Sequence, residues 1–403
     1  MESIMSYIKI GSRAYRNALI SMLLGSLVTF ATLYCPQGLI SVFSEQYHVS
    51  PSTASFTISF TTAALAISMV LIALFSNAYG RKWIMSGSLL ITSLLTILSS
   101  FGHDFHFLLL MRLLAGISLA GFPATAMAYL SEEFSPASIG VIMGVYVAGN
   151  GVGAFVGRVI IGGLTDLFSW QIALMSLGIV SLVCSLCFWM LLPESQNFQP
   201  GTVSFAQLRD NIKTGLNNKN LLYLYGIGFL LMGIYVVLFN YIGYPLRKKP
   251  YNLSQTALGF LFVVNLVGSW GSVYFGKLAD RYPRPYVIAG AILLLLTGAT
   301  LTLHNWLLPK IIGLVIFAFG FFAGHTIACG WVGIVAPKGA KSQASSLYLL
   351  FYYSGSSFIG WAGGFFWSFF GWIGVIGLIY FLLGFTALLA FKTADSGGFV
   401  NKQ

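Results

Sequence analysis

Two arginines lie deep within apolar segments of this sequence, and their chemistry needs an explanation first. Arg112 and Arg158 each lie several residues inside a long apolar stretch. A guanidinium group is costly to remove from water unless it is paired or hydrated, so both are functional candidates. None of the 10 acidic residues lies in the middle of such a stretch. Either the arginines face a wet cavity and attract an anionic or zwitterionic solute, or they bond to backbone carbonyls and to Asp166.

One histidine also lies far from the ends of its apolar segment. His325, in "FFAGHTIACGW", can change its charge near physiological pH, which makes it a candidate for proton-linked chemistry. The alternative is a hydrogen-bonded packing residue. Further polar or aromatic candidates, for which packing is also an open alternative, are Asn150, Asn265, Tyr348, Tyr352 and Tyr353.

The composition identifies the elements that position these residues as membrane-spanning helices. The 403 residues are 57% hydrophobic and only 8% charged, whereas soluble proteins carry about 25% charged residues. Segments of about 20 apolar residues can cross a bilayer as helices. Such segments occur near 17–42, 52–75, 83–101, 107–130, 139–164, 171–192, 221–244, 254–275, 286–303, 309–331, 343–366 and 371–391. The sequence therefore predicts an all-α membrane protein with twelve transmembrane helices and no large soluble domain.

Two local patterns have competing interpretations. Basic residues precede the first apolar stretch, as in a signal peptide, but the stretch is too long and lacks a small-x-small cleavage site, so it is interpreted as the first span. The pair Cys184 and Cys187 has the spacing of a redox or metal site, but no other cysteine, histidine or acid lies nearby in sequence. We interpret both cysteines as packing residues and expect no metal site.

The longest polar stretch divides the chain into two halves. It predicts an N-terminal six-helix bundle at 1–192, a cytoplasmic linker at 193–220 and a C-terminal six-helix bundle at 221–403. Most lysines and arginines fall in connections on the side of both termini, which predicts cytoplasmic termini and explains the net charge of +11 without nucleic acid. Repeated halves of this kind place a solute site near the bilayer midplane and rock about it to give alternating access.

Two charged segments occupy matching places in the halves. Sliding the sequence so that Ala73 falls on Gly276 also places Asn77 on Asp280 and Arg81 on Arg284. The segments "ALFSNAYGRK" and "GKLADRYPRP" resemble the signature G-x-L-x-D-R-x-G-R-K of the major facilitator superfamily.

The resemblance implies a cytoplasmic gate that closes through charge pairs, which form at modest cost where water reaches them. Its candidate residues are Asn77, Gly80, Arg81, Lys82, Gly276, Asp280, Arg281 and Arg284. Asn77 stands where the signature has an acid, so the first copy is expected to be the weaker one. The alternative is that the basic residues only anchor the connections on the cytoplasmic side.

Two further segments resemble motifs of the same superfamily. "RLLAGISLAG" places Arg112, Gly116 and Ala120 on one helix face, and the resemblance links Arg112 to proton transfer. The fifth span carries the glycine spacing of the exporter branches at Gly140, Gly149, Gly153 and Gly157, although Ala154 replaces the usual proline and Arg158 the last glycine. Generic helix packing is the alternative explanation of the glycines.

Four segments resemble the YnfM-type branch of bacterial inner-membrane permeases, which is generally treated as efflux-like. They are "YLSEE", "LLPES", "FNYIGY" and "QASSLYLLFYYSGSS". In this superfamily spans 1, 4, 7 and 10 line the central cavity. The resemblance therefore implies that cavity residues include Tyr34, Gln37, Arg112, Asn240, Tyr241 and His325.

The expected function is proton-linked export of a small amphipathic, anionic or zwitterionic solute by a multi-pass protein of the bacterial inner membrane. Candidate proton-coupling residues are Arg112, His325 and Asp166. The alternative is an importer or facilitator of sugar-like or organic-anion substrates. A lipid translocase and a substrate sensor have less support. No nucleotide-binding loop or zinc-ligand cluster is present, so an enzyme and a cofactor are not expected, and a monomer is predicted.

Overall fold

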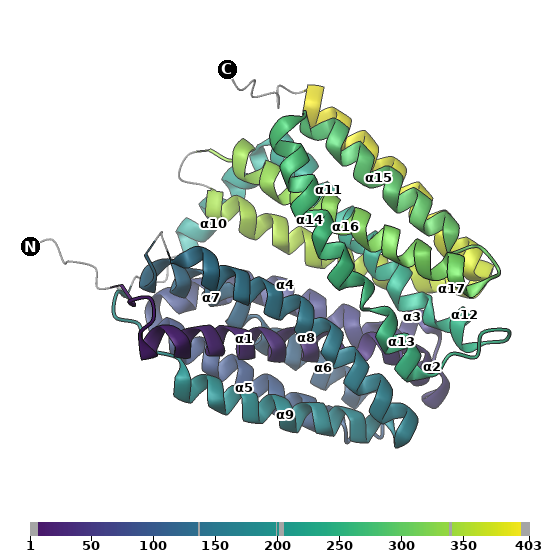
Figure 1. The fold of residues 1–403 in the computed structure, drawn as a ribbon, viewed down its shortest axis with the longest axis horizontal. Coiled ribbons are helices and arrows are strands. Elements are labelled where there is room, and N and C mark those ends of the chain that lie inside the picture. Colours follow the sequence, from purple (N-terminus) through teal and green to yellow (C-terminus); the bar gives the residue numbers. More distant parts are fainter. Residues whose placement is uncertain (1–6, 136–137, 199, 201–204, 338–340, 396–403) are drawn as a thin grey trace, which may run out of the picture. The chain divides into compact units, whose positions relative to one another are not determined.

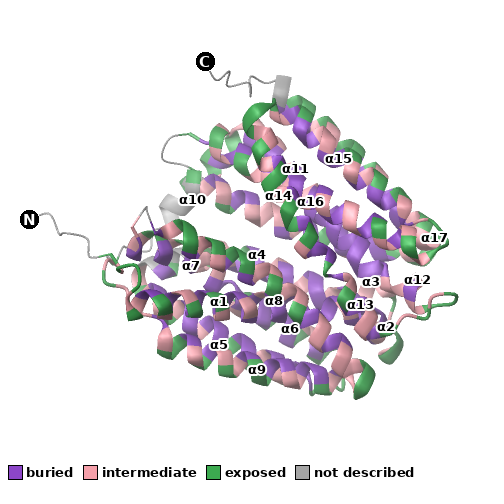
Figure 2. Ribbon diagram, viewed as in Figure 1, coloured by how far each residue is buried: buried purple, intermediate pink, exposed green. Residues whose placement is uncertain are grey.

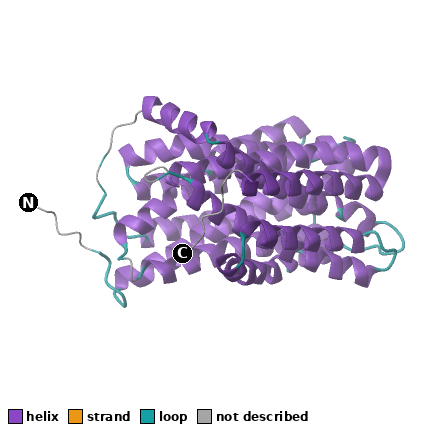
Figure 3. Cartoon of the chain, turned by 90° about the horizontal axis from the view of Figure 1, so that it is seen from above, coloured by secondary structure: helices purple, strands orange, loops and turns teal. Residues whose placement is uncertain are grey.

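The computed structural model describes residues 7–135, 138–198, 200, 205–337 and 341–395, and helices dominate throughout these ranges. No strand occurs among them, and loops only join helices (Figure 3). Contacts divide the chain into two compact units. Unit 1 comprises Met1–Leu39, Phe60–Ser204 and Gln255–Phe260, and unit 2 comprises Ile40–Ser59, Phe205–Ser254 and Leu261–Gln403.

Unit 1 is built from long helices and one 3-10 segment (Figure 1). They are α1 (Arg13–Tyr34), η1 (Cys35–Leu39), most of α4 (Phe56–Tyr79), α5 (Arg81–Ser99), α6 (Phe105–Leu119), α7 (Gly121–Glu133), α8 (Ile139–Leu167), α9 (Trp170–Leu191) and most of α13 (Gln255–Leu261).

Unit 2 has the same kind of construction. Its helices are α2 (Ile40–Gln46), α3 (Pro51–Ala54), α10 (Phe205–Asn217), α11 (Lys219–Tyr241), α12 (Gly243–Arg247), α14 (Val264–Arg281), α15 (Arg284–Leu301), α16 (Leu307–Val335) and α17 (Lys341–Asp395).

Eleven helical runs among the described residues are long and apolar enough to cross a membrane. The last of them contains a break at Gly371, where φ is 61° and ψ is −148°, a conformation that glycine adopts far more easily than other residues. The break separates the predicted spans 343–366 and 371–391. The predicted all-helical membrane fold is confirmed.

Several helices begin where local side chains can satisfy the free amides of the first turn. The Ser12 hydroxyl accepts from the Tyr15 amide at the start of α1, and the Ser169 hydroxyl accepts from the Ile172 amide at the start of α9. Asn218 caps α11 in the same way. Such caps stabilise a helix end by about 1 kcal/mol. They fix where the apolar runs begin.

Exposed residues occur along the long helices (Figure 2). Many of them are large and apolar, as a lipid-facing surface requires. On unit 1 they include Leu94, Val183 and Met190, and on unit 2 Leu293 and Phe381. A surface of this kind is unfavourable in water and suited to hydrocarbon.

Each unit contains a segment from the other half of the sequence. Within unit 1, residues 255–260 pack with α8, whose Gly162 lies against the Gln255 backbone. Within unit 2, the segment 40–59 is held by the ion pair between Glu45 and Arg247. The division at 193–220 that the sequence predicts does not account for segments 255–260 and 40–59, each of which packs in the unit formed mainly by the other half. The two six-helix bundles stay a prediction.

A close helix contact in unit 1 joins α1 to α8. A Cβ atom at Gly153 would lie 2.8 Å from the Leu27 backbone, and one at Gly157 would lie 2.7 Å from the Ala31 Cα atom. Glycines permit the two backbones to approach closely, as in other membrane helix pairs. This approach positions the end of α1 beside α8.

We expect Gly153→Ala to lower the stability of the folded protein by about 1–3 kcal/mol, because the new methyl group collides with the α1 backbone. Gly144→Ala on the same helix is the matched control, since a Cβ atom there meets nothing within 4 Å. Thermal unfolding of both purified variants measures the difference. Equal melting temperatures would contradict the packing argument.

Candidate functional site

Arg112 and Arg158 are both buried in unit 1, with exposed fractions of 0% and 2%. Arg112 projects from α6 and Arg158 from α8. Both guanidinium groups reach the segment where α1 ends and η1 begins. The two candidates singled out from the sequence therefore meet around one helix break.

The break arises because Pro36 has no amide hydrogen. In an α-helix the amide of residue 36 would bond to the carbonyl of residue 32, and in a 3-10 helix to the carbonyl of residue 33. Proline can make neither bond, so the carbonyl that residue 36 would have bonded needs another donor. The Arg112 Nη2 atom donates to the Thr32 and Leu33 carbonyl oxygens, each at 3.1 Å. Pro36 thus creates the acceptors that hold Arg112.

Arg158 is held by the other side of the same break. Its Nε atom donates to Gln37 Oε1 at 3.1 Å, and its Nη2 atom also donates to that oxygen. Its Nη1 atom donates to the Ala154 carbonyl at 2.7 Å. The guanidinium carbon lies 4.6 Å from the centre of the Tyr34 ring, within the range of a cation–π contact.

The structure therefore brings together four predicted site residues, Tyr34, Gln37, Arg112 and Arg158. In these contacts the partners of both arginines are neutral oxygen atoms and a ring face. A positive charge in a low-dielectric interior acts strongly on a nearby anion. Asn150 lies on α8, where it hydrogen bonds with Tyr146, one turn earlier.

Unit 2 contains a separate aromatic cluster around His325. The His325 Nδ1 atom lies 3.0 Å from the Tyr348 hydroxyl, and its ring centre lies 4.6 Å from that of Tyr352. Phe321 stacks between His325 and Tyr235, with ring centres 6.1 Å and 4.2 Å away. Sequence reasoning proposed His325 and Tyr352 but missed Tyr235 and Phe321. The spacing of Phe321 and His325, four residues apart on one helix, was the available signal.

The other predicted residues of unit 2 lie outside this ring cluster. The Tyr241 side chain is fully buried and donates a 2.8 Å hydrogen bond to the Gly360 carbonyl, so it ties α11 to α17. Asn240, next to it in sequence, is 3% exposed. Asn265 is buried at the start of α14. These positions suit packing at least as well as contact with a solute.

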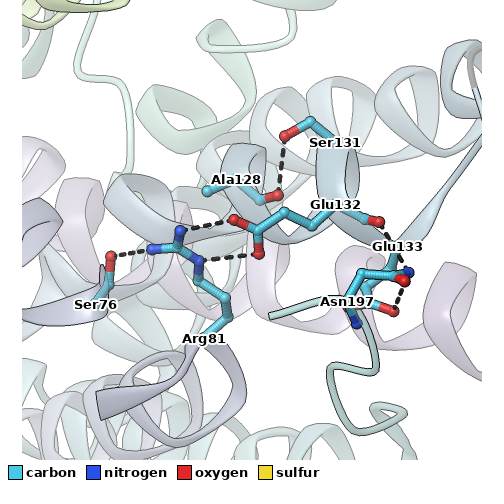
Figure 4. Close-up of polar contacts among 7 residues, drawn as sticks. All are labelled: Ser76, Arg81, Ala128, Ser131, Glu132, Glu133 and Asn197. Carbon is cyan, nitrogen blue, oxygen red and sulfur yellow. Dashed lines mark hydrogen bonds and ion pairs between the residues drawn. The ribbon is translucent and has the colours of Figure 1, made fainter. Parts of the chain in front are cut away.

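The predicted gate residue Arg81 forms a charged cluster at one end of unit 1 (Figure 4). Its Nη2 and Nε atoms donate to the two Glu132 carboxylate oxygens at 2.7 Å and 3.2 Å. Its Nη1 atom donates to the Ser76 hydroxyl at 2.6 Å, and the Phe198 ring lies against the guanidinium group. Lys82 pairs with Glu194 at 2.9 Å. The sequence analysis did not assign Glu132 to this cluster.

A second contact ties the segment after α9 to the same end of unit 1. The backbone amide of Asn197 donates to Glu133 Oε1 at 2.9 Å, and its side-chain Nδ2 atom donates to the Glu132 carbonyl at 3.1 Å (Figure 4). Adjacent glutamates therefore have different tasks: Glu132 binds the arginine, and Glu133 binds the chain that leaves the bundle.

The second copy of the charged segment is built differently. Among the described residues, no ion pair within the length of a salt bridge involves Asp280, Arg281 or Arg284. The repeat alignment offers a reason, because it places Val335 and Ala336 where the first half has Glu132 and Glu133.

Two glycines and one asparagine complete the predicted gate. Gly80 has φ 92° at the start of α5, and a Cβ atom there would meet nothing within 4 Å, so it serves the turn and not a close contact. A Cβ atom at Gly276 would meet only Thr326 Cγ2, at 3.9 Å. The side chain of Asn77 lies outside the described part of the chain.

An all-helical chain with this span pattern and with buried polar residues is typical of membrane transporters. The protein-family model described as Major Facilitator Superfamily matches residues 22–268 of this chain. The chain belongs to this superfamily, whose members are transporters and not enzymes.

Two bacterial relatives match nearly the whole chain. It is 42% identical over 379 residues to the MFS-type transporter YybF of Bacillus subtilis (strain 168), covering 94% of both chains. It is 40% identical over 382 residues to the inner membrane transport protein YnfM of Escherichia coli (strain K12), covering 94% of this chain and 90% of that one. The predicted resemblance to the YnfM-type branch is confirmed.

A solved structure has the same fold. A bacterial homologue of the human lysosomal transporter Spinster, in an inward-facing and unoccupied conformation, superposes with a TM-score of 0.79 at 16% identity, covering 96% of this chain and 99% of that one.

More distant relatives are named for organic acids. The benzoate transport protein of Acinetobacter baylyi (strain ATCC 33305 / BD413 / ADP1) is 24% identical over 322 residues, covering 69% of this chain and 67% of that one. The cis,cis-muconate transport protein of the same organism is 23% identical over 330 residues, covering 78% of each.

We expect Arg81→Ala to destabilise unit 1 by about 2–3 kcal/mol, because it leaves the Glu132 carboxylate without its two charge-assisted bonds. Lys82→Ala is the neighbouring control and should cost below about 1 kcal/mol, since its partner Glu194 is largely exposed. Chemical or thermal unfolding of the purified variants measures both. An equal loss in the two would show that Arg81 is only a surface anchor.

Proposed function

We propose that this protein is a secondary active transporter that exports a small amphipathic, anionic or zwitterionic solute in exchange for protons. The observation that carries the proposal is the pair of buried arginines around the break between α1 and η1. Burying one guanidinium group in a membrane domain costs several kcal/mol, and two within one unit are difficult to explain by packing alone.

An anionic group is the natural ligand of such a pair. A guanidinium group binds a carboxylate through two parallel hydrogen bonds, which give both strength and orientation. Gln37 accepts from the Nε and Nη2 atoms of Arg158, so a carboxylate that binds this fork takes the place of the Gln37 oxygen. The distant relatives named for benzoate and cis,cis-muconate support a carboxylate as this anionic group.

Export and proton coupling rest on other features of the chain. The glycine spacing along α8 and the YnfM-type resemblance favour export, as in the exporter branches. His325 is the candidate proton carrier of unit 2, because its ring nitrogen lies within hydrogen-bond distance of the Tyr348 hydroxyl. Arg112 and Asp166 are the other candidates. The distribution of basic residues supports an orientation with both termini in the cytoplasm. A monomer is part of the same proposal.

Import of an organic anion is the second candidate. The same arginines would serve it, and the relatives named as benzoate and cis,cis-muconate transport proteins favour this class. Ala154 stands where exporters typically have a proline, and this difference also favours import. The direction of net movement distinguishes the two candidates.

The experiment compares all small solutes retained by cells with and without the protein, before and after the proton gradient is collapsed. Export predicts that at least one organic anion or zwitterion is depleted in expressing cells and that the depletion disappears with the gradient. Accumulation of an organic anion would support import instead. An unchanged solute profile at confirmed membrane expression would contradict transport of such solutes.

Arg112→Ala and Arg158→Ala should each reduce transport of the identified solute by at least about tenfold, because each removes a charge-assisted contact of roughly 1.5–3 kcal/mol. Arg209→Ala is the matched control, since Arg209 is exposed and pairs only with its neighbour Asp210 in the observed contacts. Transport is measured at equal membrane levels of the three variants. Full transport by both buried-site variants between pH 6 and 8 would refute the arginine site.

A further inference from the structure

Basic residues gather at one end of unit 2, on the side of the membrane opposite the Arg81 cluster. They lie at the end of α12, directly after it and near the start of α16: Arg247, Lys248, Lys249 and Lys310. These connections run from odd-numbered to even-numbered spans, so they share one side, which is the outer side in the proposed orientation. Lysines and arginines are normally enriched on the inner side. Four of them together on the outer side need an explanation.

Unit 1 differs from unit 2 on this side. Its connections here carry acidic residues such as Asp104 and no lysine or arginine. Asp166, at the end of α8, accepts from the Gln255 amide at 3.0 Å and from the Thr256 amide at 2.7 Å. Basic charge on this side is therefore confined to unit 2.

Only one of the four basic residues has an acidic partner in the observed contacts. Arg247 donates to the two Glu45 carboxylate oxygens at 3.1 Å and 3.2 Å. Among the described residues, no ion pair within the length of a salt bridge involves the other three. We call these three, Lys248, Lys249 and Lys310, the outer basic cluster. Lys248 and Lys249 are exposed, whereas Lys310 is only 4% exposed.

Hydrogen bonds fix the loop that carries the two exposed lysines. The Leu253 amide donates to the Leu246 carbonyl at 2.9 Å and closes the loop. The Tyr251 hydroxyl donates to the Asn305 carbonyl, which ties the loop to the connection between α15 and α16. The Lys310 Nζ atom lies 5.6 Å from the centre of the Tyr251 ring. The buried lysine therefore lies next to the loop of the exposed ones.

The buried lysine adds its charge to this end of unit 2. Its Nζ atom donates to the Thr302 carbonyl, which carries no net charge. A positive charge in a poorly solvated position acts strongly on an anion nearby. The outer basic cluster thus favours a negatively charged ligand.

Large apolar side chains are exposed beside the same connection. The Trp372 Nε1 atom donates to the Thr302 carbonyl at 3.1 Å, which brings the chain around Gly371 to the connection between α15 and α16. The exposed residues of these two segments include Trp306, Leu308, Phe369, Phe370 and Ile373. Tryptophan is typical of the interface between membrane and water. Apolar residues next to lysines match a ligand with both acyl chains and an anionic group.

We propose that the outer basic cluster binds the phosphate of an anionic phospholipid, whose acyl chains lie against the exposed apolar residues around Trp306. Each lysine near a membrane surface strengthens the binding of an anionic lipid about fivefold. A soluble anion would use the lysines but not the apolar residues, so the lipid accounts for more of the structure. This site is separate from the arginine site of unit 1 and does not depend on the solute or on the direction of transport.

The test is hydrogen–deuterium exchange of the purified full-length protein in nanodiscs of phosphatidylglycerol or of phosphatidylcholine with the same acyl chains. Lys248→Gln/Lys249→Gln removes the two exposed charges of the cluster. Lys213→Gln/Lys219→Gln is the matched control, because it removes two exposed lysines of unit 2 on the Arg81 side.

The proposal predicts that amides in 248–254 and 302–310 exchange at least about threefold more slowly in phosphatidylglycerol than in phosphatidylcholine, since a bound lipid stabilises the segments that hold it. Loss of two lysines weakens lipid binding about 25-fold, so Lys248→Gln/Lys249→Gln should abolish this difference. The control variant should retain it.

Equal exchange of these segments in the two lipids would overturn the proposal, and so would a difference that persists in Lys248→Gln/Lys249→Gln. Glycerol phosphate, added to the phosphatidylcholine nanodiscs, is the probe for a soluble anion. Equal slowing by glycerol phosphate would assign the cluster to a soluble anion and overturn the lipid site. Because no transported solute is present, the lipid site can fail while the proposed function stands, and the reverse.

Discussion

The account depends on the cost of placing a positive charge inside a bundle of apolar helices. Arg112 and Arg158 meet this cost with neutral acceptors, and the acceptors exist because the first long helix is interrupted. Pro36 removes one amide donor, which would otherwise bond to either the Thr32 or the Leu33 carbonyl. One residue without an amide hydrogen therefore organises a site made by three helices.

Close packing around this site transmits its geometry to the rest of unit 1. Glycines on α8 let it contact the α1 backbone on one face and the 255–260 backbone on another. Such contacts are short and cannot be compressed, so movement of one helix must move its neighbours or separate from them. The same helix also carries Arg158.

The two halves share a pattern but differ in chemistry. The Arg81 cluster has two acids at the end of α7, and the alignment places apolar residues at the corresponding positions of the second half. Unit 2 contributes aromatic rings and a histidine instead of arginines. Buried charge in unit 1 and aromatic rings in unit 2 are therefore the contrasting features of the two units.

Hydrophobic segment length alone was sufficient to predict the helices and nearly all the spans, because a bilayer imposes one length and one requirement for internal backbone bonding. Buried charge was sufficient to select Arg112 and Arg158. Neither rule could identify Glu132 as the partner of Arg81, since the two are 51 positions apart and meet only through folding. The sequence also could not predict that segments 40–59 and 255–260 pack in the unit formed mainly by the other half of the chain. Tertiary contacts, and not composition, decide where a connection packs.

The most direct test of the central claim is the affinity of the purified protein for its identified solute compared with the neutral amide of that solute, measured by calorimetry. The account predicts that the anion binds at least about tenfold more tightly, corresponding to about 1.4 kcal/mol, and that Arg158→Ala removes the difference. Equal affinity for the charged and neutral forms would contradict it.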